Sequence, residues 1–232
     1  DWQIAQWLLP RVPDGDGRYR SNPLTALSRW KIFDNLRRSL TPAALVLLLA
    51  LGWLALASPW LWTLAALGIL LLPPVITALP GLLRKPGDVG WRQHLGAITS
   101  SMLQQLTHGL FTIAYLPHEA FFSLDAIART CWRMAVSRQG LLEWTPSTDA
   151  AIQKRLDLAA FYRMMASAPA SAALITLALV VLNPAALTVA GPILLLWAAS
   201  PALAWWLSQP LARQPARLTV EQQLFLRAVS RK

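Results

Sequence analysis

Residues 39–83 have the sequence SLTPAALVLLLALGWLALASPWLWTLAALGILLLPPVITALPGLL and contain no Asp, Glu, Lys or Arg. Residues 164–212 form a second stretch without any of these four residue types. A helix on the surface of a soluble protein carries charged side chains on its wet face, so charge-free runs of this length are typical of the membrane interior. The two stretches therefore predict an all-α, polytopic membrane domain.

The length of each stretch predicts how often it crosses the bilayer. A spanning helix needs about 20 residues, and each stretch is long enough for two. The turn signals Ser58-Pro59 and Asn183-Pro184 lie near the two midpoints. We therefore predict two transmembrane helical hairpins with four spans, at residues 40–57, 60–79, 168–182 and 185–207.

Basic residues flank both stretches and are absent from the two predicted tips. They are Arg37, Arg38, Arg84, Lys85, Lys154, Arg155, Arg163, Arg213 and Arg217. Short basic segments remain in the cytoplasm, so we expect both termini and the long middle segment on the cytoplasmic side. The expected anchors at the membrane interface combine such cations with tryptophans: Trp30, Arg37, Arg38, Arg84, Lys85, Trp144 and Arg213.

The net charge of +10 raises the question of a nucleic-acid partner. Basic residues beside membrane spans are first of all topology signals and contacts with anionic lipid. We therefore expect the lipid bilayer as a partner and no nucleic acid. The alternative, a very apolar soluble helical bundle, would have to bury two long charge-free runs.

The middle segment, residues 84–163, is too polar to be expected to span. Apolar residues from Leu95 to Leu116 recur every three or four positions, which indicates one helical face. Pro117 predicts a break, with a second amphipathic helix from His118. Crossing the bilayer would carry Glu119 and other charged groups into lipid at high cost. We expect cytoplasmic helices lying on the membrane surface, like the one predicted for residues 26–38.

The sequence offers few groups for catalysis or metal binding. His94, His108 and His118 lack the spacing of helical metal ligands, and Cys131 is the single cysteine. Residues 14–17, Asp-Gly-Asp-Gly, lie beside prolines and predict a polar turn. We expect no catalytic residue, metal or other cofactor in this segment. The start at Asp1, without signal-peptide features, suggests a piece of a longer polypeptide.

Particular strings of residues carry a resemblance to a known family. They are DWQIAQWLLP (1–10), NPL (22–24), SRWKIFDNLRR (28–38), LPHEA (116–120), LDAIART (124–130), LLEWT (141–145) and the tail 218–232. Together they resemble the part of the cyclic β-1,2-glucan synthases, glycosyltransferase family 84, that follows the transferase core. The tail resembles the start of the linker to the glucoamylase-like and phosphorylase-like regions downstream.

The resemblance implies a very large, multi-pass enzyme of the bacterial inner membrane that polymerises glucose from UDP-glucose and cyclises the product. It implies that the catalytic residues, UDP-glucose and a divalent metal, Mg or Mn, belong to a cytoplasmic transferase domain upstream. The segment with this sequence would anchor and orient that domain, and would assist passage of the growing β-1,2-glucan.

Asp1, Trp2, Gln3 and Trp7 are candidate contacts for the acceptor end of the glucan. The resemblance puts the first three directly after a Q/RxxRW-type acceptor motif. Trp2 and Trp7 offer flat faces of the kind on which sugar rings stack, and Asp1 and Gln3 can hydrogen-bond to hydroxyl groups. It is equally open at this point that the two tryptophans only anchor the helix at the interface.

A second function remains compatible with the sequence: a stand-alone integral membrane transporter or scaffold subunit without catalytic activity. A pump normally carries an ionisable residue inside a span, and neither hairpin has one. This absence favours the membrane anchor of a transferase over a transporter. The expected layout is a post-catalytic segment and interfacial helix (1–38), the first hairpin (39–83), amphipathic helices (84–163), the second hairpin (164–212) and the start of a cytoplasmic linker (213–232).

Overall fold

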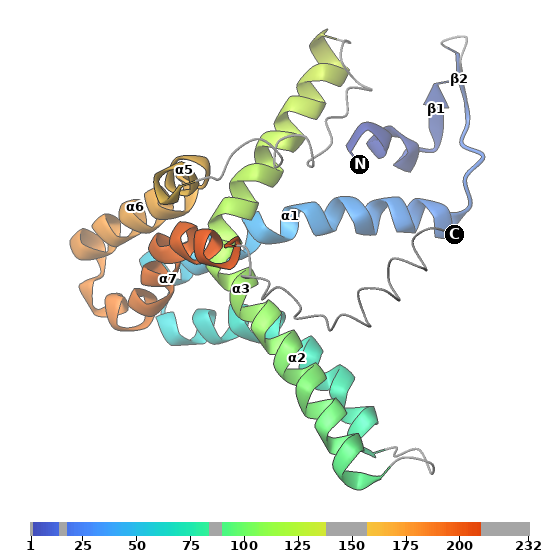
Figure 1. Cartoon of the computed structure of the whole chain (residues 1–232). Helices are drawn as coiled ribbons and strands as arrows, with labels where there is room; N and C mark the ends of the chain where they lie inside the picture. The colour runs from blue at the N-terminus through green and yellow to red at the C-terminus, as the bar shows by residue number, and fades with distance from the viewer. Residues whose placement is uncertain (1, 14–17, 84–89, 138–156, 210–232) are drawn as a thin grey trace, which may run out of the picture.

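The computed structural model describes residues 2–13, 18–83, 90–137 and 157–209 (Figure 1). The elements are, in order, η1 (Trp2–Leu8), β1 (Arg11–Pro13), β2 (Tyr19–Ser21), α1 (Ala26–Leu54), α2 (Pro59–Leu83), α3 (Trp91–Trp132), η2 (Arg133–Ser137), α5 (Leu158–Met164), α6 (Ser167–Leu182), η3 (Pro184–Ala186) and α7 (Leu187–Leu207). The described chain is thus almost entirely helical, which confirms the predicted all-α class.

Helix α1 joins two elements that the sequence predicted separately. We expected an interfacial helix to Arg38 and then a turn into the first span, but one unbroken helix runs from Ala26 to Leu54. Thr25 caps its start, because its Oγ1 accepts a hydrogen bond from the Ser28 amide. Pro42 lies inside the helix, where it removes one backbone hydrogen bond without ending the element.

The two predicted hairpin turns are confirmed. Ser58 has a φ of 59°, the left-handed conformation that reverses the chain, and Pro59 begins α2. In the second hairpin, α6 ends at Leu182 and Pro184 begins the short helix η3. The amide of Asn183 links the two tips, since its Nδ2 donates to the Trp53 carbonyl at 3.0 Å.

The predicted break at Pro117 is wrong. Helix α3 continues through this residue from Trp91 to Trp132 and passes directly into the π-helical turn η2. Leu116, Pro117 and Ala120 are all buried against neighbouring helices. Packing of this face holds the helix together across the one hydrogen bond that proline removes.

Three helical segments are long and apolar enough to cross a membrane: α1, residues 59–81 of α2, and η3 with α7. Helices α5 and α6 meet the same criterion only as a pair, and they are bent by 68° at the break between them. The described part of the chain therefore contains three candidate spans, or four if the bent pair crosses as one. Helix α3 is not among them.

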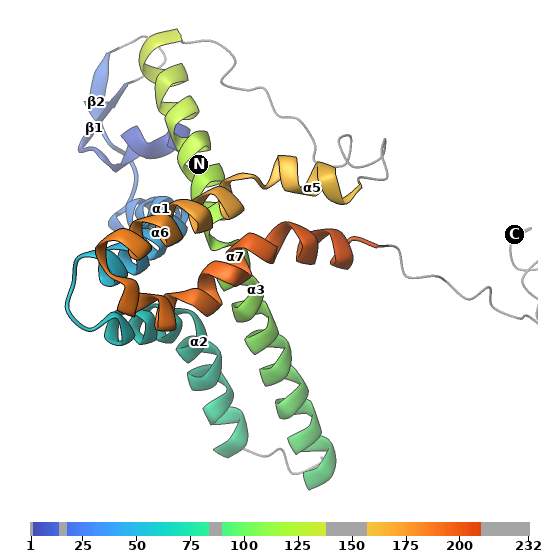
Figure 2. The same ribbon diagram turned by 90° about the vertical axis from the view of Figure 1, so that its left-hand side faces the viewer.

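The long helix α3 runs across α1, α6 and α7 rather than alongside them (Figures 1 and 2). Its middle packs against α1, α6 and α7, and α2 lies beside its first half. One end of α3 thus reaches the N-terminal segment, and the other projects away from the bundle with the end of α2 (Figure 2).

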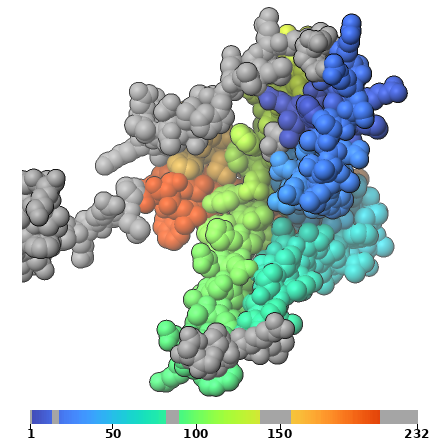
Figure 3. All heavy atoms as spheres, turned by 90° about the vertical axis from the view of Figure 1, so that its right-hand side faces the viewer, coloured from blue at the N-terminus to red at the C-terminus, as the bar shows by residue number. Residues whose placement is uncertain are grey.

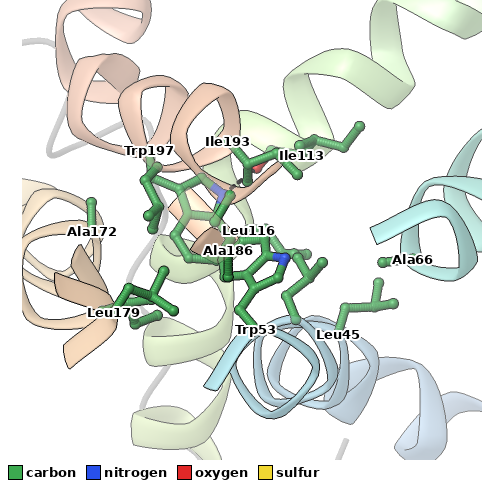
Figure 4. Close-up of a cluster of buried hydrophobic side chains, with 14 residues drawn as sticks. Leu45, Trp53, Ala66, Ile113, Leu116, Ala172, Leu179, Ala186, Ile193 and Trp197 are labelled. Carbon is green, nitrogen blue, oxygen red and sulfur yellow. Dashed lines mark hydrogen bonds between the residues drawn. The ribbon is translucent and has the colours of Figure 1, made fainter. Parts of the chain in front are cut away.

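The core lies where α1, α3, α6 and α7 meet (Figure 4). Trp53 and Trp197 are completely buried there, with ring centroids 5.9 Å apart. Each indole N–H has a partner: Trp53 donates to Thr63 Oγ1 and Trp197 to the Ile113 carbonyl, both at 2.9 Å. The core cluster consists of Leu45, Leu49, Trp53, Ala66, Ile113, Leu116, Ala172, Ile175, Leu179, Ala186, Ala190, Ile193, Leu194 and Trp197.

A short antiparallel β-hairpin precedes α1 and was not predicted. Arg11 pairs with Ser21, Val12 with Arg20 and Pro13 with Tyr19. The predicted polar turn at residues 14–17 connects the two strands and lies outside the described residues. Three residues per strand are too few for alternation to be recognised in the sequence.

Candidate functional site: the groove between η1 and α1

The N-terminal segment folds back onto the first half of α1. Trp2 is half-buried, and its Nε1 donates a hydrogen bond to Ser39 Oγ at 2.8 Å. Ser39 in turn donates to the carbonyl of Leu36, one turn earlier in α1. This relay fixes the start of η1 beside the point where α1 becomes free of charges.

Asn22 holds the other end of the segment. Its Nδ2 donates to the carbonyls of Trp7 at 2.7 Å and Leu9 at 2.8 Å, while its Oδ1 accepts from the Leu24 amide at 2.9 Å. The backbone N–H of Asn22 also donates a hydrogen bond to the Pro10 carbonyl. The side chain and backbone of Asn22 together thus link η1, the β-hairpin and the entry to α1.

An open groove of about 360 Å³ lies between η1 and α1. Ile4, Lys31, Ile32, Asp34, Asn35 and Arg38 line it. Asp34 pairs with both Arg37, at 2.7 Å, and Arg38. These pairs are exposed on the arginine side, so they orient the side chains more than they stabilise the fold.

The groove presents side chains that can bind a polar ligand. It combines a carboxylate, an amide and two cationic side chains with apolar walls, and offers hydrogen bonds to a polar ligand or to another domain. In the described residues no three His, Cys, Asp or Glu side chains are arranged to hold a metal ion.

The structure brings only some of the predicted site residues together. Trp2 and Trp7 are half-buried and Gln3 is exposed, all in η1, but none of the three lines the groove. Trp30 is 61% exposed and lies beside Phe33, with ring centroids 5.7 Å apart, as suits an interfacial anchor. The predicted residues Asp1, Arg84, Lys85, Trp144 and Arg213 lie outside the described residues.

Asn22 and Ser39 were missed as site residues. Asn22 belongs to one of the strings that resemble the synthase family, yet nothing in the local sequence indicates that its amide binds carbonyls more than ten residues away. Lys31 and Asn35 follow the helical spacing of the basic stretch before the first span. Their common groove depends on where η1 folds back, which the sequence does not show.

A second polar contact joins α3 to α6. The imidazole of His118 lies with Nδ1 3.3 Å from Ser167 Oγ, next to the break between α5 and α6. Partial burial lowers the pKa of His118 and raises the pKa of its neighbour Glu119, because each charged form loses water. Both shifts favour neutral side chains at this crossing.

A comparison with known proteins finds a relative that matches nearly the whole chain. The chain is similar to the cyclic beta-(1,2)-glucan synthase NdvB of Rhizobium meliloti (strain 1021), with 31% identity over 228 residues. The match covers 97% of this chain and 8% of that protein, so the chain spans less than a tenth of the relative's length. No family model matches the chain.

Proposed function

We propose that this chain, which is related over nearly its whole length to a cyclic β-(1,2)-glucan synthase, is the membrane domain of such an enzyme. In this proposal it anchors and orients a cytoplasmic transferase that makes β-1,2-glucan from UDP-glucose, and it assists passage of the glucan. The observation that carries the proposal is the similarity across both hairpins and the segments between them, combined with three to four candidate spans.

The proposal divides the work between this chain and the rest of the protein. The transferase upstream would hold UDP-glucose, the divalent metal and the catalytic residues, and the glucoamylase-like and phosphorylase-like regions would follow downstream. The domain would lie in the bacterial inner membrane with both termini in the cytoplasm. The described residues show no metal cluster, which is compatible with this division but does not by itself support it.

The N-terminal segment is the surface on which the transferase would rest. Its residues Ile4, Leu9 and Tyr19 are 42%, 56% and 71% exposed, although apolar and aromatic groups of this size favour contact with protein. The groove beside it adds Lys31 and Arg38, and supplies polar contacts at the rim of such an interface.

The first test is synthesis by membranes that contain the full-length protein, supplied with labelled UDP-glucose. We expect β-1,2-glucan that disappears when the upstream transferase is deleted. Membranes that make no glucan, from a gene that encodes no transferase, would overturn the proposal. The chain would then be a stand-alone transporter or scaffold subunit.

The anchoring role can be tested with variants that loosen the N-terminal segment. Asn22→Ala removes three side-chain hydrogen bonds and Trp2→Phe removes the bond to Ser39. We expect both to lower glucan synthesis while leaving the amount of inserted protein unchanged. The matched controls are Gln93→Ala near the start of α3 and Trp60→Phe near the start of α2, because both side chains are exposed and neither lines the groove. Equal activity of variants and controls would contradict orientation of the transferase by this segment.

A further inference from the structure

Helix α3 contains a long run of residues without a charged side chain. Residues 93–118 include no Asp, Glu, Lys or Arg, in a chain whose net charge is +10. The helix is nevertheless not one of the candidate spans, because Ser, Thr, Gln and His alternate with its apolar residues. Residues 93–118 of α3 are therefore a polar but uncharged helical stretch, and their side chains suit a neutral, polar ligand.

Several of the uncharged polar residues lie in one row on a face of this helix, and others lie on a neighbouring row. Ser100, Gln104, Thr107 and Phe111 follow one another at spacings of four, three and four, which places them in one row. With Leu103 and the neighbouring His108 they line a shallow hollow of about 380 Å³. We call these six residues the neutral stripe.

The neutral stripe is not part of the core. The opposite face of α3 carries the buried residues Gly109, Ile113 and Leu116, which pack against the other helices. In the space-filling view α3 is uncovered along much of its length, between α7 on one side and α1 and α2 on the other (Figure 3). The stripe residues Ser100, Gln104, Thr107 and His108 are all exposed.

An aromatic surface extends the stripe toward the middle of α3. Phe111 and Tyr115 are stacked one turn apart, with ring centroids 6.0 Å apart and planes 10° from parallel. Flat rings beside hydroxyl and amide groups suit a ligand that has both C–H faces and hydroxyl edges. A pyranose ring has both.

The side chains of the neutral stripe suit a sugar better than they suit a phosphate headgroup or an acyl chain. A phosphate headgroup would require Lys or Arg, which residues 93–118 do not supply. An acyl chain would leave the amide of Gln104 and the ring nitrogens of His108 without partners in an apolar environment. A neutral, hydroxyl-rich chain satisfies these groups.

We propose that the neutral stripe of α3 binds an uncharged glucan chain and guides it along the membrane domain. The inference rests on the proposed function, which supplies β-1,2-glucan as the ligand. Binding would be shallow and spread over several sugar units, since each contact is exposed and the hollow is open. Such a surface suits a chain that has to slide as it grows.

The test uses two sets of substitutions in the full-length protein. The stripe variant combines Ser100→Ala, Gln104→Ala and Thr107→Val. The control variant makes the same three types of change on a neighbouring row of the same helix, Ser101→Ala, Gln105→Ala and Thr112→Val. The threonines are well matched, because Thr107 and Thr112 each donate to the carbonyl four residues earlier.

The first readout is binding of a linear β-1,2-glucan oligosaccharide to the purified protein, measured by calorimetry. We expect about a tenfold loss of affinity in the stripe variant, from several weakened hydrogen bonds, and less than about a twofold change in the control. The second readout is the length distribution of labelled glucan, which should shift to shorter chains only in the stripe variant. Phe111→Leu, which keeps an apolar side chain but removes the flat ring, should act in the same direction.

The outcomes separate this inference from the proposed function. A protein that makes β-1,2-glucan but binds the oligosaccharide equally well in stripe and control variants would overturn the stripe alone. A protein that makes no glucan but loses oligosaccharide binding in the stripe variant would overturn the proposed function and leave a carbohydrate site. Binding of anionic lipid vesicles that depends on the stripe, without oligosaccharide binding, would also overturn the inference.

Discussion

Helices α2 and α7 are similar in composition and opposite in environment. Their most apolar windows have mean hydropathies of 2.0 and 1.7, and neither helix contains a charged residue. Yet 11% of the α2 window is buried in the protein and 44% of the α7 window. Hydropathy therefore predicts that both can enter a membrane, but not which of them forms the core.

The burial of α7 follows from its neighbours on both sides. Residues on one face of α7 pack against α6 and α3: Val189, Ala190, Ile193, Leu194, Trp197, Ser200 and Pro201. Small residues such as Ala190 let helices approach closely, as is common among membrane helices. Trp197 then fills the centre and binds the Ile113 carbonyl of α3.

Helix α2 contacts α1 near its start and lies beside the first half of α3. Thr63 Oγ1 accepts the indole N–H of Trp53, and Trp62 lies directly against Gly52 of α1. Many of its large apolar side chains are nevertheless exposed, for example Leu64, Ile69 and Leu72. The comparison teaches that α7 is packed against several helices, whereas α2 leaves most of its apolar surface exposed.

The largest expected effect is the loss of Trp197. Trp197→Ala removes a fully buried indole and leaves the Ile113 carbonyl without its side-chain donor, so we expect a loss of about 3–5 kcal/mol in the free energy of unfolding. Trp60→Ala at the start of α2, where the side chain is 63% exposed, should cost less than about 0.5 kcal/mol. Equilibrium unfolding in mixed micelles measures the loss of stability in both variants. Equal losses would contradict the difference in packing between α7 and α2.

The second effect concerns the fit between α1 and α2. A Cβ at Gly52 would lie 2.4 Å from Trp62 Cβ, so Gly52→Ala forces the two helices apart at a cost of about 1–3 kcal/mol. Gly68→Ala meets no atom within 4 Å and should be neutral or stabilise α2 by up to about 1 kcal/mol. Thermal unfolding followed by size-exclusion chromatography distinguishes them. A neutral Gly52→Ala would show that α2 is not held by this fit.

A smaller effect is expected at the tips that join the two hairpins. Asn183→Ala removes the bond from Nδ2 to the Trp53 carbonyl and should cost about 1 kcal/mol. The control is Thr188→Ala, because the Thr188 hydroxyl is exposed and bonds only to the nearby Ala185 carbonyl. The same unfolding assay applies, and a loss no greater than that of the control would mean that packing alone joins the hairpins.

The smallest effect is a pH dependence at the crossing of α3 and α6. Because burial lowers the pKa of His118, the unfolded chain binds more protons than the folded one, and stability falls as pH drops through the ordinary histidine pKa of about 6.5. His118→Gln should reduce this fall between about pH 7.5 and 5.5.

Glu119 should change the pH dependence of stability in the opposite direction, which gives a check. Its pKa is raised, so the folded state favours the protonated form and Glu119 contributes more to stability as pH falls toward its ordinary pKa. Glu119→Gln should therefore steepen the loss of stability on acidification, whereas His118→Gln makes it shallower. Melting temperatures measured across this pH range test both signs, and parallel curves for the two variants would contradict the assignment.

Much of the fold was predictable because it depends on local chemistry. The charge-free runs and the turn signals at Ser58-Pro59 and Asn183-Pro184 predicted two hairpins, and both turns are present. The breaks expected near Ser39 and at Pro117 were wrong because packing on α1 and α3 keeps each helix continuous. A proline costs one hydrogen bond, and a buried face can offset that loss.

The candidate site was predictable only in outline. The family-like strings around Trp2 and Asn22 indicated that the N-terminal segment matters. The bonds from Trp2 to Ser39 and from Asn22 to two distant carbonyls join residues far apart in sequence. No periodicity or motif specifies such contacts, because they exist only once η1 has folded back on α1.

The sequence by itself determined that the protein is helical, that it contains two charge-free hairpins, and that it resembles the glucan synthases. These properties follow from hydropathy, charge and local strings, which act over short distances along the chain. Only the tertiary structure decided that α7 contributes far more to the core than α2, that α3 crosses α1, α6 and α7, and that the described helices leave its neutral stripe exposed. Those outcomes depend on which faces fit together in space, and helices of nearly equal hydropathy can differ completely in that respect.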